Sequence, residues 1–210
     1  MQNLLNALDV PTPPPLDPGP LWSRLLLETP WYVAALLLVV AVVVYVLMNR
    51  RGHFSKGLTT AGVLVALAAA VVGASALIET PRERMRATAR QLIDAVVRAD
   101  GTDLSALLAR NARLVYFMSP QGLGKDEIVA LVDQQFRGEY RINEWSILES
   151  QATMDGPEVG RVQLKVRVVA AEWNVPNVSW WRIDLRREGE TGILVTGISP
   201  IVIAGVREAQ

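Results

Sequence analysis

The sequence contains no cysteine, and its only histidine is His53. The absence of cysteine excludes disulfides, thiolate metal sites and a cysteine nucleophile. Because His53 lies between two apolar runs, the rest of the chain has no histidine for a zinc site or a Ser-His-Asp triad. We therefore expect no metal site and no cofactor.

The chain also lacks a net charge, since 21 cationic residues balance 21 anionic residues. A surplus of lysine and arginine is typical of nucleic-acid binding, and none is present. We therefore expect no nucleic-acid partner.

Two apolar runs, residues 31–48 and 58–78, contain no charged side chain and are separated by a predicted loop at residues 49–57. As helices they would be about 27 and 31 Å long at ~1.5 Å per residue, close to the ~30 Å of hydrocarbon in a bilayer. Trp31 and Tyr32 fit an aromatic belt at one membrane surface. We therefore predict a two-helix transmembrane hairpin, with the lipid bilayer as a partner.

Small residues recur at every fourth position of the second run. A stripe of this kind lets two helices approach closely in lipid, so we predict that it packs against the first helix. It could instead mark a channel or a substrate path, but neither run contains an ionisable group, which favours anchoring over transport. The predicted helix-packing residues are Gly62, Ala66, Ala70 and Ala74.

The charges beside the two runs bear on their orientation. Arg50, Arg51 and Lys56 favour a cytoplasmic loop, whereas four arginines between Arg82 and Arg90 favour the reverse. Short loops follow the positive-inside rule better than segments that lead into a large domain. We therefore predict an integral protein of a bacterial cytoplasmic membrane, with the residues after Thr80 on the extracytoplasmic side.

The tail at residues 1–30 is rich in proline between positions 11 and 20. Proline lacks the amide hydrogen that a helix needs, so this stretch is predicted to be extended. Its PxxP spacing could dock in an aromatic groove, but a spacer is the favoured interpretation. Residues 21–29 predict an interfacial helix with Trp22 at headgroup depth.

About 130 residues follow Thr80, which is enough for one domain. Residues 80–83 form a Thr-Pro-Arg-Glu capping box, and the helix that follows has apolar residues on one face. We expect Thr102 to cap a short second helix, residues 113–118 to form a strand, and the residues from Ser119 to form a loop. A third helix is predicted from Lys125 to Phe136.

After the third helix the apolar period changes from 3.6 to 2. This change predicts strands at residues 141–154, 159–171, 178–187 and 193–203, with Pro200 at a sheet edge or a bulge. The predicted fold class of residues 80–210 is therefore α+β, with three helices packed on a curved antiparallel sheet. By alternation, Trp181, Ile183 and Leu185 point inward, whereas Trp180, Arg182 and Asp184 point outward.

This order of elements resembles the nuclear-transport-factor-two-like cone fold, also called the SnoaL-like or ketosteroid-isomerase-like superfamily. The local marks are residues 124–128 at the start of the third helix, the strand at 159–169, and Ser-Trp-Trp-Arg-Ile at 179–183. The resemblance covers residues 81–204. It implies a cavity between the helices and the concave sheet, where the sites of isomerases, dehydratases and non-catalytic members lie.

Acid–base chemistry in such a cavity would need an inward carboxylate and a hydrogen-bond donor. The inward positions are apolar, and Asp184 is expected to form a cross-strand ion pair on the outer face. The candidates for lining the pocket are Tyr116, Trp145 and Trp181, although core packing is the favoured interpretation of the two tryptophans. The candidate interaction surface is Trp180 with Lys165 and Arg182.

We therefore predict a membrane-anchored SnoaL-like domain that binds a small ligand or a partner protein, or forms a homodimer through the outer sheet face. Two alternatives remain open: a membrane-tethered isomerase- or dehydratase-type enzyme that uses the cone cavity, and a structural subunit of a membrane complex. A polar cavity with a carboxylate would favour the enzyme, whereas a cavity filled by apolar side chains would favour the binding module.

Overall fold

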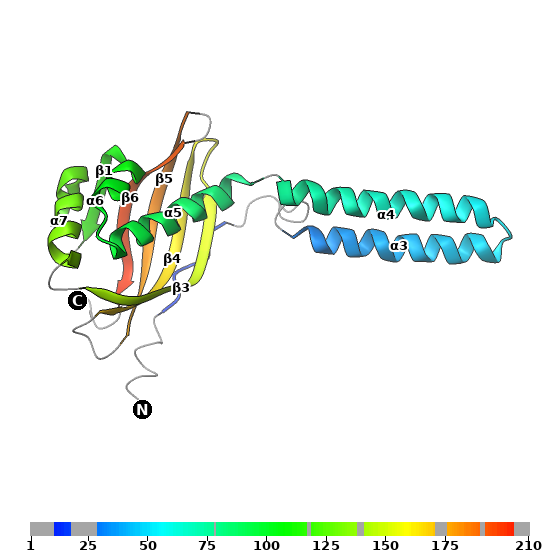
Figure 1. Cartoon of the computed structure of the whole chain (residues 1–210), viewed down its shortest axis with the longest axis horizontal. Coiled ribbons are helices and arrows are strands. Elements are labelled where there is room, and N and C mark those ends of the chain that lie inside the picture. Colours follow the sequence, from blue (N-terminus) through cyan, green and yellow to red (C-terminus); the bar gives the residue numbers. More distant parts are fainter. Residues whose placement is uncertain are drawn as a thin grey trace, which may run out of the picture. The chain divides into compact units, whose positions relative to one another are not determined.

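A computed structural model describes residues 11–17, 29–77, 79–116, 119–137, 141–170, 176–189 and 192–203. It consists of a helical hairpin and a domain of helices packed on a sheet (Figure 1). The chain divides into two compact units, and most contacts between residues lie within one unit or the other. One is Pro18–Thr80, which contains the hairpin, and the other combines Met1–Asp17 with Pro81–Gln210. The predicted interfacial helix at 21–29 lies outside the described residues, except for Thr29.

The hairpin consists of α3 (Pro30–Arg50) and α4 (Phe54–Leu77). Only residues 51–53 connect them, and Gly52 has a φ of 76°, a conformation that glycine adopts without strain. The amide of His53 donates to the carbonyl of Met48 at 3.0 Å, which closes the end of α3. The connection is therefore shorter than the predicted loop at 49–57, because α3 continues to Arg50 and α4 begins at Phe54.

The packed face of the hairpin alternates steps of four and three residues, as in a coiled coil. In α3 the positions on this face are Pro30, Ala34 and Ala41, which are buried, and half-buried Leu37. In α4 they are Gly57 and Ala68, which are buried, and half-buried Ala61 and Leu64. A Cβ atom on Gly57 would lie 3.0 Å from the Cβ of Met48, so the helices approach closely there.

The predicted helix-packing stripe is wrong, because all four of its residues are exposed. A strict spacing of four rotates about 40° per step around a helix with 3.6 residues per turn. Such a stripe therefore drifts away from a straight partner, whereas alternating steps of four and three stay on it. The exposed residues are Gly62, Ala66, Ala70 and Ala74.

Three helices cover the inner face of the sheet: α5 (Pro81–Val97), α6 (Gly101–Leu107) and α7 (Lys125–Arg137). The N-cap of α6 is Asp100 and not Thr102 as predicted. The Asp100 carboxylate accepts hydrogen bonds from the amides of Thr102 and Asp103, both at 3.1 Å. At the start of α7 the Glu127 carboxylate accepts from the amide of Gly124 at 2.7 Å.

The sheet has the strand order β2-β1-β6-β5-β4-β3 among the described residues. All neighbouring pairs are antiparallel except β1 and β6, which are parallel, so the sheet is mixed and not wholly antiparallel as predicted. The α+β class and the packing of helices on a sheet are confirmed. The strands are β1 (Leu108–Tyr116), β2 (Ser119–Gly124), β3 (Ile142–Met154), β4 (Val159–Ala170), β5 (Asn177–Glu188) and β6 (Gly192–Ile203).

Two predictions in the first half of the sheet need correction. The strand predicted at 113–118 begins earlier, at Leu108, and residues 117–118 lie outside the described residues. The loop predicted after Ser119 is instead the edge strand β2. Its sequence, SPQGLG, is depleted in β-formers, and pairing with β1 overrides this weak local preference.

The register of β4 defines two faces of the sheet. Leu164 pairs with Ser150 on β3 and Trp181 on β5, and this row belongs to the inner face under the helices. Gln163 pairs with Gln151 and Arg182, and this row belongs to the outer face. The predicted bulge at Pro200 is confirmed by a register shift, because Trp181 pairs with Pro200 while Trp180 pairs with Val202.

The hydrophobic core lies between the inner face and the helices. Its buried side chains come from α5 and α7 as well as from the inward positions of the strands. They include Met85, Leu92, Ile128, Val162, Leu164, Val166, Ile183 and Leu185. The inward alternation predicted for β4 and β5 is therefore confirmed.

Candidate binding site

The strand register brings Trp145 and Trp181 to the same face of the sheet. Trp145 pairs with Val168 and Trp181 pairs with Leu164, and directly paired residues point to the same side. Both tryptophans are half-buried, so each reaches from the core towards solvent. The Nε1–H of Trp181 donates to the hydroxyl of Ser179 at 2.8 Å, which fixes the indole ring in orientation.

Tyr116 is placed elsewhere. It is half-buried and ends β1, beyond a register shift after Leu114. Since β6 separates β1 from β5, Tyr116 lies two strands away from Trp181, or about 10 Å at ~4.8 Å per strand. Trp145 on β3 is also two strands from Trp181 on β5, and its partner on β4 is four residues from that of Trp181. No two of the three predicted pocket residues therefore lie on neighbouring strands.

The buried polar side chains of the described residues are hydroxyls, one amide and one guanidinium. They are Thr80, Arg82, Thr88, Thr153, Gln163 and Ser179. No aspartate or glutamate of the described part of the chain is buried, and no group of three or more of its His, Cys, Asp and Glu residues could hold a metal ion. An acid–base pair of the kind that isomerisation needs is therefore absent from the described interior.

Two of the exposed or half-buried carboxylates instead form ion pairs on the outer face, and one of these pairs joins β4 to β5. Asp184 Oδ1 lies 2.9 Å from Nε of Arg182 and 3.4 Å from Nε of Arg161, whose other end reaches Asp155 at 3.1 Å. The expected cross-strand role of Asp184 is confirmed. These side chains are about one-third exposed, so each pair adds little stability.

Trp180 lies on the outer face as alternation predicts, but it is fully buried there with Val178. The ammonium of Lys165 lies 5.8 Å from the centre of the Trp180 ring and 3.3 Å from Oε1 of Glu149. The candidate interaction surface of Trp180, Lys165 and Arg182 therefore shares one face, but its tryptophan is not exposed. Alternation gives the direction of a side chain and not what covers it.

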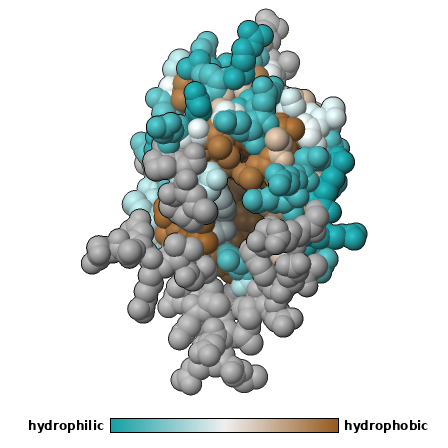
Figure 2. Space-filling model, turned by 90° about the vertical axis from the view of Figure 1, so that its left-hand side faces the viewer, coloured by the Kyte–Doolittle hydropathy of each residue, from teal (hydrophilic) through white to brown (hydrophobic). Residues whose placement is uncertain are grey.

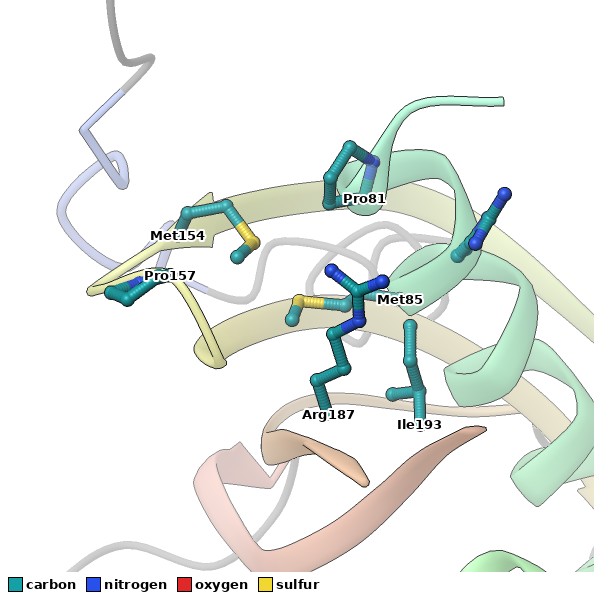
Figure 3. A pocket seen from close by; sticks show the side chains of 7 residues that line it. Pro81, Met85, Met154, Pro157, Arg187 and Ile193 are labelled. Carbon is teal, nitrogen blue, oxygen red and sulfur yellow. The ribbon is translucent and has the colours of Figure 1, made fainter. Parts of the chain in front are cut away.

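A small cavity lies beside the first turn of α5, where the guanidinium of Arg187 points between Pro81 and Met85 (Figure 3). Its volume of about 30 Å³ holds roughly two water molecules. None of the predicted pocket residues lines it. The lining residues are Pro81, Arg84, Met85, Met154, Pro157, Arg187 and Ile193, and the space is too small for a substrate.

Figure 2 shows a hollow on one face of the molecule, with hydrophobic side chains on its floor. Several apolar side chains of the domain both pack against the core and remain half-buried. They are Leu114, Leu123, Phe136, Ile147, Val168, Trp181 and Ile198. The partly exposed side chains that pack on the core are therefore apolar, and the Ser179 hydroxyl on the same face is buried and accepts from Trp181.

Several solved structures are similar to this domain. An NTF2-like protein from Cytophaga hutchinsonii is 12% identical, with a TM-score of 0.50 over 58% of this chain and 98% of that chain. A ketosteroid isomerase-like protein from Erwinia carotovora atroseptica is 17% identical, with a TM-score of 0.47 over 60% and 99%. A domain of unknown function with a cystatin-like fold from Nostoc punctiforme is 22% identical, with a TM-score of 0.47 over 59% and 78%.

No protein-family model matches the sequence, and no curated protein matches it either. At 12% identity the match to the Cytophaga protein establishes the fold alone. The domain after the hairpin therefore has the NTF2-like fold, which confirms the resemblance seen in the sequence.

Proposed function

We propose that this protein is a membrane-anchored binding module, in which the hairpin anchors an NTF2-like domain that binds an apolar ligand or partner at its inner face. The observation that carries the proposal is the character of that face. It combines aliphatic side chains with Trp145, Trp181 and Ser179, and no described carboxylate is buried there. Apolar walls with a few placed polar groups are typical of ligand-binding sites.

The anchoring part of the proposal is supported by the surface of the hairpin. Both helices are long and apolar enough to cross a membrane, and only 11% of each span is buried, unlike the core helix of a soluble protein. Leu36 and Val42 are each 63% exposed, and an apolar surface this extended is unfavourable in water. The test is carbonate washing of membranes, after which the chain is expected in the membrane pellet. Recovery in the aqueous fraction would overturn the anchoring.

The binding part can be tested with the full chain in lipid nanodiscs and the fluorescent apolar probe 1-anilinonaphthalene-8-sulfonate. We expect energy transfer from tryptophan to the probe to fall several-fold in Trp181→Ala. The matched control is Trp31→Ala, because it removes the same number of tryptophans from an exposed site in the hairpin. Equal losses in the two variants would show that the probe reports only on lipid, and would overturn binding at the inner face.

The enzyme alternative predicts a different result. Isomerisation of a β,γ-unsaturated ketosteroid by the nanodisc preparation, at a rate lowered by Trp181→Ala and not by Trp31→Ala, would replace the binding module with a catalyst. The structural-subunit alternative is tested by blue-native electrophoresis. A large complex that disappears when the hairpin is exchanged for an unrelated one would favour it.

A further inference from the structure

The segment Pro11–Asp17 lies against the domain that follows the hairpin. The amide of Leu16 donates to the side-chain carbonyl of Gln151 on β3 at 3.1 Å. Pro13 is buried and Leu16 is half-buried, although the segment forms neither helix nor strand. Figure 1 shows this segment in dark blue beside β3. The interpretation of this stretch as a free spacer is therefore wrong for residues 11–17.

The register places the contact on the outer face of the sheet. Gln151 pairs with Gln163, and both residues are on the outer face, as is the Glu149–Lys165 ion pair. Two outer residues at this edge of the sheet are nearly inaccessible: Thr153 is 4% exposed and Gln163 is 7% exposed. Polar side chains on a bare outer face of a sheet would be in contact with water, so the burial of these two agrees with a cover over this part of the face.

The composition of the segment determines which atom makes the contact. Residues 13–15 are three consecutive prolines, which have no amide hydrogen. The next donor along the chain is the amide of Leu16, and this is the group that Gln151 accepts from. Consecutive prolines also restrict the free segment to extended conformations, so less conformational entropy is lost when it docks.

We propose that Pro11–Asp17 is an intramolecular ligand of the outer sheet face, and that β3 with its neighbour β4 forms a docking surface for this extended proline-rich segment. The segment precedes the hairpin and the domain follows it, so docking attaches both ends of the hairpin to one folded unit. The outer face is therefore occupied by the chain itself at β3 and β4.

Hydrogen exchange in the full chain tests this assignment directly. A peptide spanning residues 11–17 has few exchangeable amides, because four of its seven residues are proline. We expect the Leu16 amide to be protected, and to exchange at least about tenfold faster in Gln151→Ala, which removes its acceptor. Gln135→Ala on α7 is the matched control, because Gln135 is an exposed glutamine outside the contact.

The amides of β4 and β5 serve as an internal reference, and they should remain protected in both variants. Free exchange of the Leu16 amide in the wild-type chain would overturn the proposal. So would protection that is unchanged in Gln151→Ala. Protection that is lost on dilution would show that the segment docks on a second copy, and would overturn the intramolecular assignment. None of these results depends on ligand binding at the inner face.

Discussion

Gly160 is a single residue that determines how closely α5 packs on the sheet. A Cβ atom at this position would clash with Sδ of Met85 and would lie 2.7 Å from the backbone oxygen of Thr153. The methionine side chain can move, but the backbone of β3 cannot, so any larger residue must separate the strands or the helix.

We predict that Gly160→Ala lowers the free energy of unfolding by about 1–3 kcal/mol, as expected for overpacking of a filled core. The measurement is denaturant unfolding of the full chain in detergent, followed by tryptophan fluorescence. Gly156→Ala in the neighbouring turn is the control, because a Cβ there would contact nothing within 4 Å. Equal stability of the two variants would contradict the close packing of α5 on β4.

Asp100 has an equally local role at the start of α6. Its carboxylate accepts from two amides that would otherwise lack partners. We predict that Asp100→Ala costs about 1 kcal/mol and accelerates exchange of the Thr102 and Asp103 amides. Asp100→Asn should retain most of the stability, because asparagine caps helices about as well as aspartate. Slow exchange of both amides in Asp100→Ala would argue against the cap.

At the residue scale, the sequence predicted the directions of side chains better than their burial. The alternation in β5 correctly assigned Ile183 and Leu185 to the core and Asp184 to an outer ion pair. It could not predict that Trp180 would be buried on the opposite face, because the burial of an outer residue depends on segments distant in sequence. The docking of Leu16 on Gln151 is such a contact, since 135 positions separate the two residues.

The hairpin shows what determines the structure at the level of elements. Its two helices meet at small residues, and Ala68 is buried at 4% exposure whereas Ala70 on the same helix is exposed. A leucine at position 68 must therefore push the helices apart, whereas a leucine at position 70 extends into the surroundings.

We predict that Ala68→Leu lowers the thermal unfolding midpoint of the helical signal in detergent, and that Ala70→Leu does not. Far-UV circular dichroism of the full chain reports this signal. A larger loss in Ala70→Leu than in Ala68→Leu would favour the stripe of every fourth residue as the packing face.

Local pattern predicted some elements well and missed others for physical reasons. The β4 strand alternates strictly between apolar and polar residues, and its bounds were predicted to within one residue. The β2 strand contains two glycines and a proline in six residues, so only its pairing with β1 specifies it. The order of strands was not predicted either. The pairing of β1 with β6 joins strands that are separated by most of the domain's sequence, and a local pattern does not report such a contact.

At the scale of the whole molecule, the contact of Leu16 with Gln151 constrains membrane topology. The segment before the hairpin and the domain after it belong to one compact unit, so they must lie on the same side of any membrane that the hairpin enters. A chain that leaves and returns to one side crosses an even number of times, which two helices satisfy.

We predict that a membrane-impermeant maleimide labels Thr12→Cys and Glu188→Cys from one side and His53→Cys from the other. The chain has no native cysteine, so each variant reports on a single site. We expect the first two sites on the extracytoplasmic side, as the cations of the loop suggest. Labelling of all three sites from the same side would show that the hairpin does not span the membrane.

The position of β6 has a consequence for biosynthesis. It is the last described strand in the chain, yet it lies between β1 and β5 in the middle of the sheet. A nascent polypeptide therefore cannot join the two halves of its sheet until β6 itself has been translated. The apolar helices α3 and α4 emerge from the ribosome much earlier. They can therefore insert into a bilayer before β6 pairs with β1 and β5.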